Sequence, residues 1–333
     1  MIPIAFVDAP TPAKPGPKAS PETLSQYLQQ SKQLRLPLVA SRQIQALRRD
    51  LDGDPDGATR LLYMFGDGGQ TNGTVLKDLP ERTVMVGRIR KDAKLYFLPP
   101  APTTRAAGRP RHYGDPAPTP EQVRIDDSIP WQTVTISISG AEHQMRVKVC
   151  RDRLWRSAGL RHTLQLVVIA PLGYRLRQGS KLLYRQPAFL ICTDPQMDLL
   201  ALLQGYVHRW DIEVNFREEK TLLGVGQAQV RNPESVQTVP ALQVAAYAML
   251  LLATIRATAP SSDAERLPAP KWSSVDPSRR MSTQRAIQQL RAETWGRGLG
   301  LLNFSDLRTS VPVNTKSEKF VPHLPSALFY ANN

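Results

Sequence analysis

The sequence contains little of what several common protein classes require. Only two of its 333 residues are cysteines, Cys150 and Cys192, and neither has a partner at metal-ligand spacing. A disulfide framework and a cysteine zinc site are therefore excluded as organising features. The five histidines are scattered along the chain, so they form no recognisable metal-binding motif.

Long apolar runs are also scarce. The longest, 239–253, is interrupted by Pro240 and Gln243 and is shorter than a membrane-spanning helix needs. It predicts a buried helix. The first eight residues lack the basic start and the length of a secretory signal. We therefore expect a cytoplasmic protein that is not associated with a membrane.

Acidic residues are outnumbered by basic ones. The chain has 43 Lys and Arg against 29 Asp and Glu, a formal net charge of +14. Such an excess favours a polyanionic partner, of which nucleic acid is the commonest. A basic protein with its charge spread evenly is the alternative. The length allows one large domain or two.

The segment from Met197 to Gly224 is predicted to form one amphipathic helix. At about 100° per residue, four side chains fall within about 60° of one another on one side of it. These are Tyr206, Arg209, Glu213 and Lys220. A carboxylate between two cations suits a metal ion or a phosphate, but it also suits a surface helix with ion pairs such as Arg209 with Glu213. The spacing alone leaves both interpretations open.

A second candidate carboxylate follows an apolar strand predicted over 60–67. This strand ends in Asp67, and Gly68 and Gly69 come next. In open α/β sheets, ligands bind just past the carboxyl ends of the strands. Asp67 therefore either projects into a site or caps a turn.

The same residues resemble a known family. The pattern Tyr-x2-Arg-x3-Glu-x6-Lys, starting at Tyr206, matches all four positions and all three spacings of the signature of bacterial insertion-sequence transposases of the DDE type. The continuation 223–231 and the block 65–95 around Asp67 are similar to the same family. The resemblance covers roughly residues 2–270. One departure is Gly69-Gln70, where relatives often have a small residue followed by an aromatic one.

The resemblance implies an α/β fold with a ribonuclease-H-like mixed sheet, helices on both faces and a β-rich insertion. The implied segments are 1–82 for the first part of the core, 83–186 for the insertion, 187–258 for the last core strand and the catalytic helices, and 259–333 for a partly disordered tail. Ile2–Val7 would be the third core strand. The first two strands and the first catalytic aspartate would then lie upstream of Met1, which would leave the chain inactive as given unless Asp8, the only nearby substitute, takes that role.

The resemblance also implies roles for the candidate residues. Asp67 and Glu213 would be catalytic ligands of two Mg²⁺ ions, with Mn²⁺ as an alternative, whereas Tyr206, Arg209 and Lys220 would hold DNA phosphates. Two such ions support the in-line displacement at phosphorus that DNA cleavage and strand transfer require. The partners would be double-stranded DNA at the transposon ends and target, and further copies of the chain in the DNA complex. The protein would then work at the nucleoid.

Two other functions remain open from the sequence. One is a catalytically inactive transposase remnant that only binds DNA, and the other is an interaction protein with an accidental motif. Trp131 and Trp155 lie among arginines in the β-rich region. Each either packs in the core or stacks on an unpaired base.

Local patterns predict the remaining elements. Helical spacing starts at Pro21 and continues through 36–51, a short helix is expected within 72–79, and a further helix within 283–294. Short β runs are predicted at 83–89, 95–98, 132–138, 144–149, 165–170 and 188–192, with an exposed basic loop at 99–120.

Overall fold

The computed structural model describes residues 1–7, 9–100, 111–138, 141–174, 179–257 and 281–298. The chain divides into two compact units. We call Asp8–Trp210 the sheet unit, and Met1–Val7 together with Asp211–Asn333 the helical unit. Each unit is described by itself.

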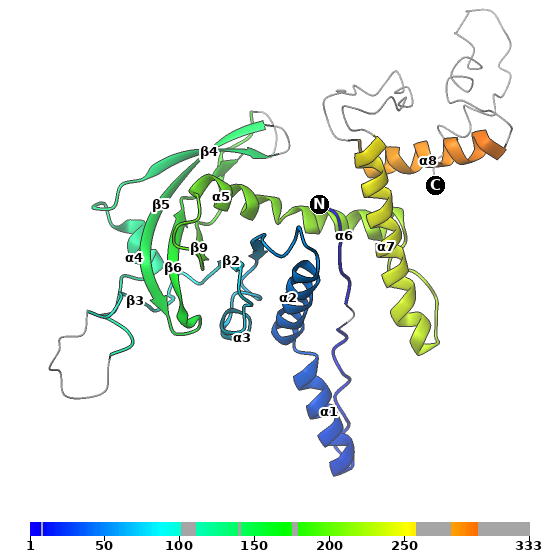
Figure 1. Cartoon of the computed structure of the whole chain (residues 1–333), viewed down its shortest axis with the longest axis horizontal. Helices are drawn as coiled ribbons and strands as arrows, with labels where there is room; N and C mark the ends of the chain where they lie inside the picture. Colours follow the sequence, from blue (N-terminus) through cyan, green and yellow to red (C-terminus); the bar gives the residue numbers. More distant parts are fainter. Residues whose placement is uncertain (8, 101–110, 139–140, 175–178, 258–280, 299–333) are drawn as a thin grey trace, which may run out of the picture. The chain divides into compact units, whose positions relative to one another are not determined.

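The sheet unit is built on one seven-stranded mixed sheet (Figure 1). Its order is β1-β2-β9-β6-β5-β3, with β4 paired to β5. The strands are β1 (Leu62–Gly66), β2 (Thr83–Arg88), β3 (Leu95–Tyr96), β4 (Gln132–Ile138), β5 (Ala141–Trp155), β6 (Gly159–Ile169) and β9 (Ala188–Cys192). A separate two-stranded sheet is formed by β7 (Gly173–Tyr174) and β8 (Leu183–Tyr184).

One pair of strands in this sheet is parallel. β1 runs parallel to β2, and the connection between them contains the short helix α3 (Gly73–Lys77). The other pairings in the described sheet are antiparallel, including β2 with β9 and β6 with β9. Because β1 is at the end of the strand order, it is an edge strand. The carboxyl ends of β1 and β2 point the same way and meet at one border of the sheet.

Helices cover both faces of the sheet, because the side chains of each strand alternate between two apolar clusters. On one face, Leu166 and Ile191 pack with Ile44 of α2 (Leu36–Gly53) and Leu76 of α3. On the other, Val167 and Leu190 pack with Leu202 and Leu203 of α5 (Leu199–His208). The α/β class with a mixed sheet and helices on both faces is therefore confirmed.

The remaining helices of the sheet unit are α1 (Pro21–Gln33) and α4 (Pro120–Ile125). Ser20 caps α1, as the Ser-Pro-Glu start suggests, and a Thr119–Gln122 capping box starts α4, which the sequence analysis missed. The strands predicted at 132–138 and 188–192 are confirmed with the same bounds, and the other predicted β runs overlap β2, β3, β5 and β6.

The predicted strand at Ile2–Val7 is wrong, because these residues form neither helix nor strand. The run lacks a strand partner among the described residues, and apolar composition without pairing does not make a strand. Asp8 lies outside the described residues, as does much of the predicted loop 99–120 and of the tail 259–333.

The single helix predicted from Met197 to Gly224 is also wrong. It is two helices, α5 and α6 (Asp211–Leu222), separated by a turn at Arg209–Trp210. The amide of Trp210 donates to Val207 at 3.1 Å, three residues back, which tightens the end of α5. Asp211 and Glu213 then occupy the first turn of α6, where negative charge is favourable. Gly224, at φ +68°, follows the end of α6 as predicted.

The helical unit contains α6, α7 (Pro233–Ala257) and α8 (Thr283–Gly298). Helix α7 packs against α6, and the α8 segment is helical, as predicted. The prediction that α7 is buried fails, because its buried residues are Val244, Tyr247 and Leu251. By length and composition alone, this 25-residue helix is also able to cross a membrane, a criterion that helices of soluble proteins meet as well.

Candidate functional site

Asp67 is placed by β1 at the border where the parallel strands end. The strand stops at Gly66, and the next carboxylate is exposed. Its Oδ1 accepts hydrogen bonds from the amides of Gly69 at 2.9 Å and Gln70 at 3.2 Å. The side chain therefore caps its own turn, which is one of the two interpretations left open by the sequence, and it stands exposed at the strand end.

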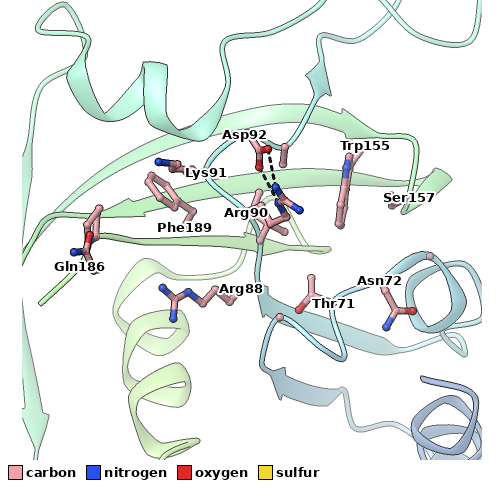
Figure 2. A pocket seen from close by; sticks show the side chains of 15 residues that line it. Thr71, Asn72, Arg88, Arg90, Lys91, Asp92, Trp155, Ser157, Gln186 and Phe189 are labelled. Carbon is pink, nitrogen blue, oxygen red and sulfur yellow. Dashed lines mark hydrogen bonds and ion pairs between the residues drawn. The ribbon is translucent and has the colours of Figure 1, made fainter. Parts of the chain in front are cut away.

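A cleft opens directly beside this turn (Figure 2). Its volume is about 700 Å³. Four segments line it: the loop after β1, the chain from the end of β2 onward, the end of β5 with the turn after it, and the start of β9. The lining residues are Gly68, Thr71, Asn72, Gly73, Arg88, Ile89, Arg90, Lys91, Asp92, Ala93, Trp155, Ser157, Gln186, Pro187 and Phe189.

The charge of this cleft is positive. Arg88, Arg90 and Lys91 are all exposed, and one carboxylate, Asp92, accompanies them. Arg90 holds Asp92 through two hydrogen bonds, Nε to Oδ1 at 2.9 Å and Nη2 to Oδ2 at 3.0 Å. This pairing lowers the pKa of Asp92 from its ordinary value. Three cations against one carboxylate leave two net positive charges for an anionic ligand.

The close approach of the chain segments depends on Gly87. A Cβ at Gly87 would overlap the hydroxyl and methyl groups of Thr71. The Thr71 hydroxyl in turn donates to the backbone oxygen of Asp67 at 2.6 Å. This contact joins the end of β2, where the cations of the cleft begin, to the turn that carries Asp67.

Tyr206 and Arg209 lie at the end of α5 in the same sheet unit. Helix α5 packs directly on β1, since a Cβ at Gly205 would overlap the ring of Phe65. The Arg209 guanidinium carbon is 5.5 Å from the centre of the Tyr206 ring. The Nε of Arg209 is buried and makes no hydrogen bond within the described residues.

Glu213 and Lys220 belong to the helical unit. Both side chains are exposed on α6, whose buried residues are Asn215 and Glu219. The junction of the two units therefore falls within the four-residue signature, with Tyr206 and Arg209 on one side and Glu213 and Lys220 on the other. The ion pair of Arg209 with Glu213, which the spacing allows, would join residues of different units.

A buried polar network holds the helical unit together, and the sequence analysis missed it. The hydroxyl of Tyr247 donates to a carboxylate oxygen of Glu218 at 2.6 Å, and the Oδ1 of Asn215 lies 3.3 Å from the same hydroxyl. The hydroxyl of Thr283 donates to the same Glu218 oxygen at 2.6 Å. These bonds connect α6, α7 and α8. A tyrosine within the apolar run 239–253 was the available signal, because a buried Tyr hydroxyl needs a partner.

The described residues offer few grouped ligands for a metal ion. They contain no group of three or more His, Cys, Asp or Glu side chains that could hold a metal. Asp67 is a hard oxygen donor of the kind Mg²⁺ accepts, although one of its oxygens already serves the turn amides. The sheet unit by itself supplies this one carboxylate of the predicted pair, and the helical unit supplies Glu213.

Comparison with known proteins assigns no family. No protein-family model matches the sequence, and the search of curated proteins finds no significant match.

Proposed function

We propose that the chain carries catalytic residues of a DDE-type DNA transposase and has a ribonuclease-H-like fold. The observation that carries the proposal is Asp67, an exposed carboxylate at the carboxyl end of a parallel strand pair beside a cationic cleft. The signature from Tyr206 to Lys220 supports it independently. The net charge of +14 suits a DNA partner.

In this proposal, Asp67 and Glu213 are the two carboxylates of this chain that hold divalent metal. Bound Mg²⁺ or Mn²⁺ would activate the attacking oxygen and stabilise the leaving oxygen at phosphorus. Arg209 binds a phosphate through its planar fork, and Lys220 binds one as a point charge. Tyr206 donates a hydrogen bond to a phosphate and supports the Arg209 guanidinium with its ring.

The reaction would be hydrolysis of a phosphodiester bond at the ends of an insertion sequence, followed by strand transfer to target DNA. Two ends are joined in such a reaction, so we propose that several copies of the chain act together on DNA. The protein would work in the cytoplasm, at the nucleoid.

The test of this proposal is nicking of supercoiled plasmid DNA by the purified full chain. Each reaction contains Mg²⁺ or Mn²⁺ at millimolar concentration, and the blank contains EDTA in place of the metal. With Asp8 in the place of the first catalytic aspartate, we expect metal-dependent nicking by the wild type that falls to background in Glu213→Gln and in Asp67→Asn. Because neither residue is proposed to bind phosphate, gel-shift affinity for DNA should change little. The exposed Glu142 of β5 provides the matched control, Glu142→Gln, which should nick normally. Wild-type nicking by Glu213→Gln would disprove the assignment.

A second candidate is an inactive remnant that only binds DNA. It is favoured by one observation, that the described residues contain no group of three metal-ligating side chains. Salt-sensitive, sequence-independent DNA binding without nicking by the wild type in either metal would support it. Absence of DNA binding at moderate salt would instead support an interaction protein.

A further inference from the structure

We propose that two copies of the chain pair through α7, with the two helices antiparallel, in the absence of DNA and of metal ions. The proposed function requires several copies of the chain but leaves open how they contact one another. The pairing uses neither Asp67 nor the signature residues, so its failure and the failure of the catalytic proposal are seen in different experiments.

Helix α7 carries apolar side chains on two opposite sides. Its buried residues, Val244, Tyr247 and Leu251, lie on the side from which the Tyr247 hydroxyl donates to Glu218 of α6. At about 100° per residue, five other side chains fall within about 80° of one another on the opposite side of the helix. This exposed seam consists of Leu242, Ala245, Met249, Leu252 and Arg256.

The exposed seam has the spacing of a coiled coil. Its members follow one another at intervals of three, four, three and four residues, so they occupy the two inward positions of a heptad repeat. No charged side chain occurs between Glu234 and Arg256. Helix α8 crosses α7 beside the seam (Figure 1), and the two line an apolar groove of about 410 Å³, which the exposed Met249 and Leu290 border. An apolar stripe of this width is suited to packing against another helix.

The side chains of the seam fit a second copy of the seam in the antiparallel orientation. If Leu242 of one copy faces Leu252 of the other, Ala245 then faces Met249, so a long side chain lies against a small one. In a parallel pair each residue would face its own equivalent. Two alanines would then leave a gap, and two methionines would crowd the next layer. Size therefore favours the antiparallel pair.

Charge favours the same orientation. In the antiparallel register, Arg256 of one copy faces Thr238 of the other, one helical turn from Glu234. Neither Arg256 nor Glu234 has a salt-bridge partner in the described part of the chain. The pair would thus have an opposite-charge contact at each end. A parallel pair would instead place Arg256 beside Arg256, which is repulsive.

A lipid surface is the other partner that an apolar helix of this length allows. To enter lipid, α7 would lose the hydrogen bond from Tyr247 to Glu218 and carry the hydroxyl into an apolar medium without that partner. Pairing of two copies leaves this bond intact, because the seam is on the opposite side of the helix. Pairing also depends on concentration, so the dilute single chain keeps the seam exposed.

The first test is sedimentation equilibrium of the purified full chain. The protein is treated with nuclease and measured in EDTA at high salt, so that nucleic acid does not bridge the copies. We expect a monomer–dimer equilibrium with a dissociation constant on the order of micromolar. Leu242→Glu should weaken pairing by at least about tenfold, because each copy then places a carboxylate in an apolar contact.

Leu36→Glu is the matched control for this variant. Leu36 at the start of α2 is 70% exposed, compared with 69% for Leu242, but it lies outside α7. The control should pair like the wild type. Circular dichroism at low concentration checks that both variants stay folded, as expected for substitutions at exposed positions.

Disulfide formation determines the orientation of the two helices. Ala245→Cys protein mixed with Met249→Cys protein and then oxidised should give a crosslinked dimer, and each protein alone should give much less. The natural cysteines, Cys150 and Cys192, are buried and do not compete.

Exchange of charges checks the same orientation without a crosslink. Arg256→Glu should weaken pairing severalfold, because it places two carboxylates near each end of the pair. Addition of Glu234→Arg to that variant should restore pairing, since the opposite-charge contacts are then present with their signs exchanged.

Three results would overturn the inference. The first is a wild type that stays monomeric well above micromolar concentration, or a dimer that Leu242→Glu leaves unchanged. The second is preferential crosslinking of Ala245→Cys with itself, which indicates a parallel pair. The third is flotation of a monomeric wild type with neutral phospholipid vesicles at high salt, lost in Leu242→Glu, which would identify a lipid surface as the partner. A dimer without metal-dependent nicking would sustain the pairing and reject the catalytic proposal, and nicking by a monomeric chain would do the reverse.

Discussion

The two units of the molecule differ in the share of polar side chains among those they bury. In the sheet unit, strands β2, β5, β6 and β9 place apolar residues on both faces, and Leu166, Val167, Leu190 and Ile191 are fully buried. In the helical unit, α6 turns Asn215 and Glu219 inward. Its longest helix, α7, leaves large apolar side chains exposed, including Leu242 and Met249.

The difference shows that the two units are stabilised by different interactions. Burial of apolar surface is non-directional and tolerates small changes of shape. A buried polar network depends on every donor and acceptor having its partner. The sheet unit is thus expected to be stable through its core, whereas the helical unit is stabilised through a few directional bonds around Tyr247.

The same substitution in the two units gives the largest expected contrast. Leu190→Ala removes a fully buried side chain between β2 and β6 and should lower the free energy of unfolding by about 2–5 kcal/mol. Leu242→Ala removes a side chain that is 69% exposed and should change it by no more than about 0.5 kcal/mol. Urea unfolding, monitored by hydrogen exchange of individual segments, measures the change in the free energy of unfolding for both variants. Equal losses would show that α7 is covered in solution.

Buried polar contacts give the second contrast. Lys148 is fully buried, and its ammonium donates to the carbonyl oxygens of Val123 at 3.2 Å, Arg124 at 3.0 Å and Asp126 at 2.6 Å. Lys148→Met leaves these acceptors of α4 without their donor, so a loss of about 1–3 kcal/mol is expected. Tyr247→Phe, in the helical unit, should cost about 1 kcal/mol. A stabilised Lys148→Met protein would show that the buried charge is costly there.

Acid titration of Glu219 should affect the helical unit. Burial raises the pKa of the Glu219 carboxyl above its ordinary value of 4.5. The protonated form therefore suits the folded state, and the contribution to stability is complete below the unfolded pKa and is lost as the pH rises through the folded pKa. Glu219→Gln should be more stable than the wild type at pH 7, and the gap should close toward pH 4. Hydrogen exchange of the amides along α6 measures this difference in stability between the variant and the wild type. A difference that does not depend on pH would contradict burial of the carboxyl as the cause.

His162 should produce the smallest effect, with the opposite sign and in the sheet unit. Burial lowers the pKa of this imidazole from its ordinary value of 6.5, and its Nε2 lies 3.1 Å from the carbonyl oxygen of Leu76. The neutral ring donates to that oxygen. Its contribution is present above the unfolded pKa and is lost as the pH falls through the folded pKa. Stability of the sheet unit should thus decline below about pH 6.5, and His162→Gln should flatten this decline.

The part of the candidate site that the sequence predicted is the part that depends on neighbouring residues in the chain. Asp67 follows an apolar strand, and a strand end is visible in a few residues of pattern. The cleft beside it was missed, although the same rule applies to Arg88, Arg90 and Lys91, which end and follow β2. What brings Trp155 and Gln186 to these cations is the pairing of β5, β6 and β9, which joins segments far apart in the chain.

The sequence by itself determined the α/β class, the bounds of β4 and β9, the start of α1 at Pro21 and the glycine after α6, because hydrophobic periodicity and turn chemistry act over a few residues. Only the tertiary structure decided that Ile2–Val7 is not a strand, that the signature helix is two helices, and that α7 is largely exposed. Strand formation needs a partner edge, and both halves of an interrupted helix keep the same spacing. Burial is a property of the surrounding elements, so an apolar run does not specify what covers it.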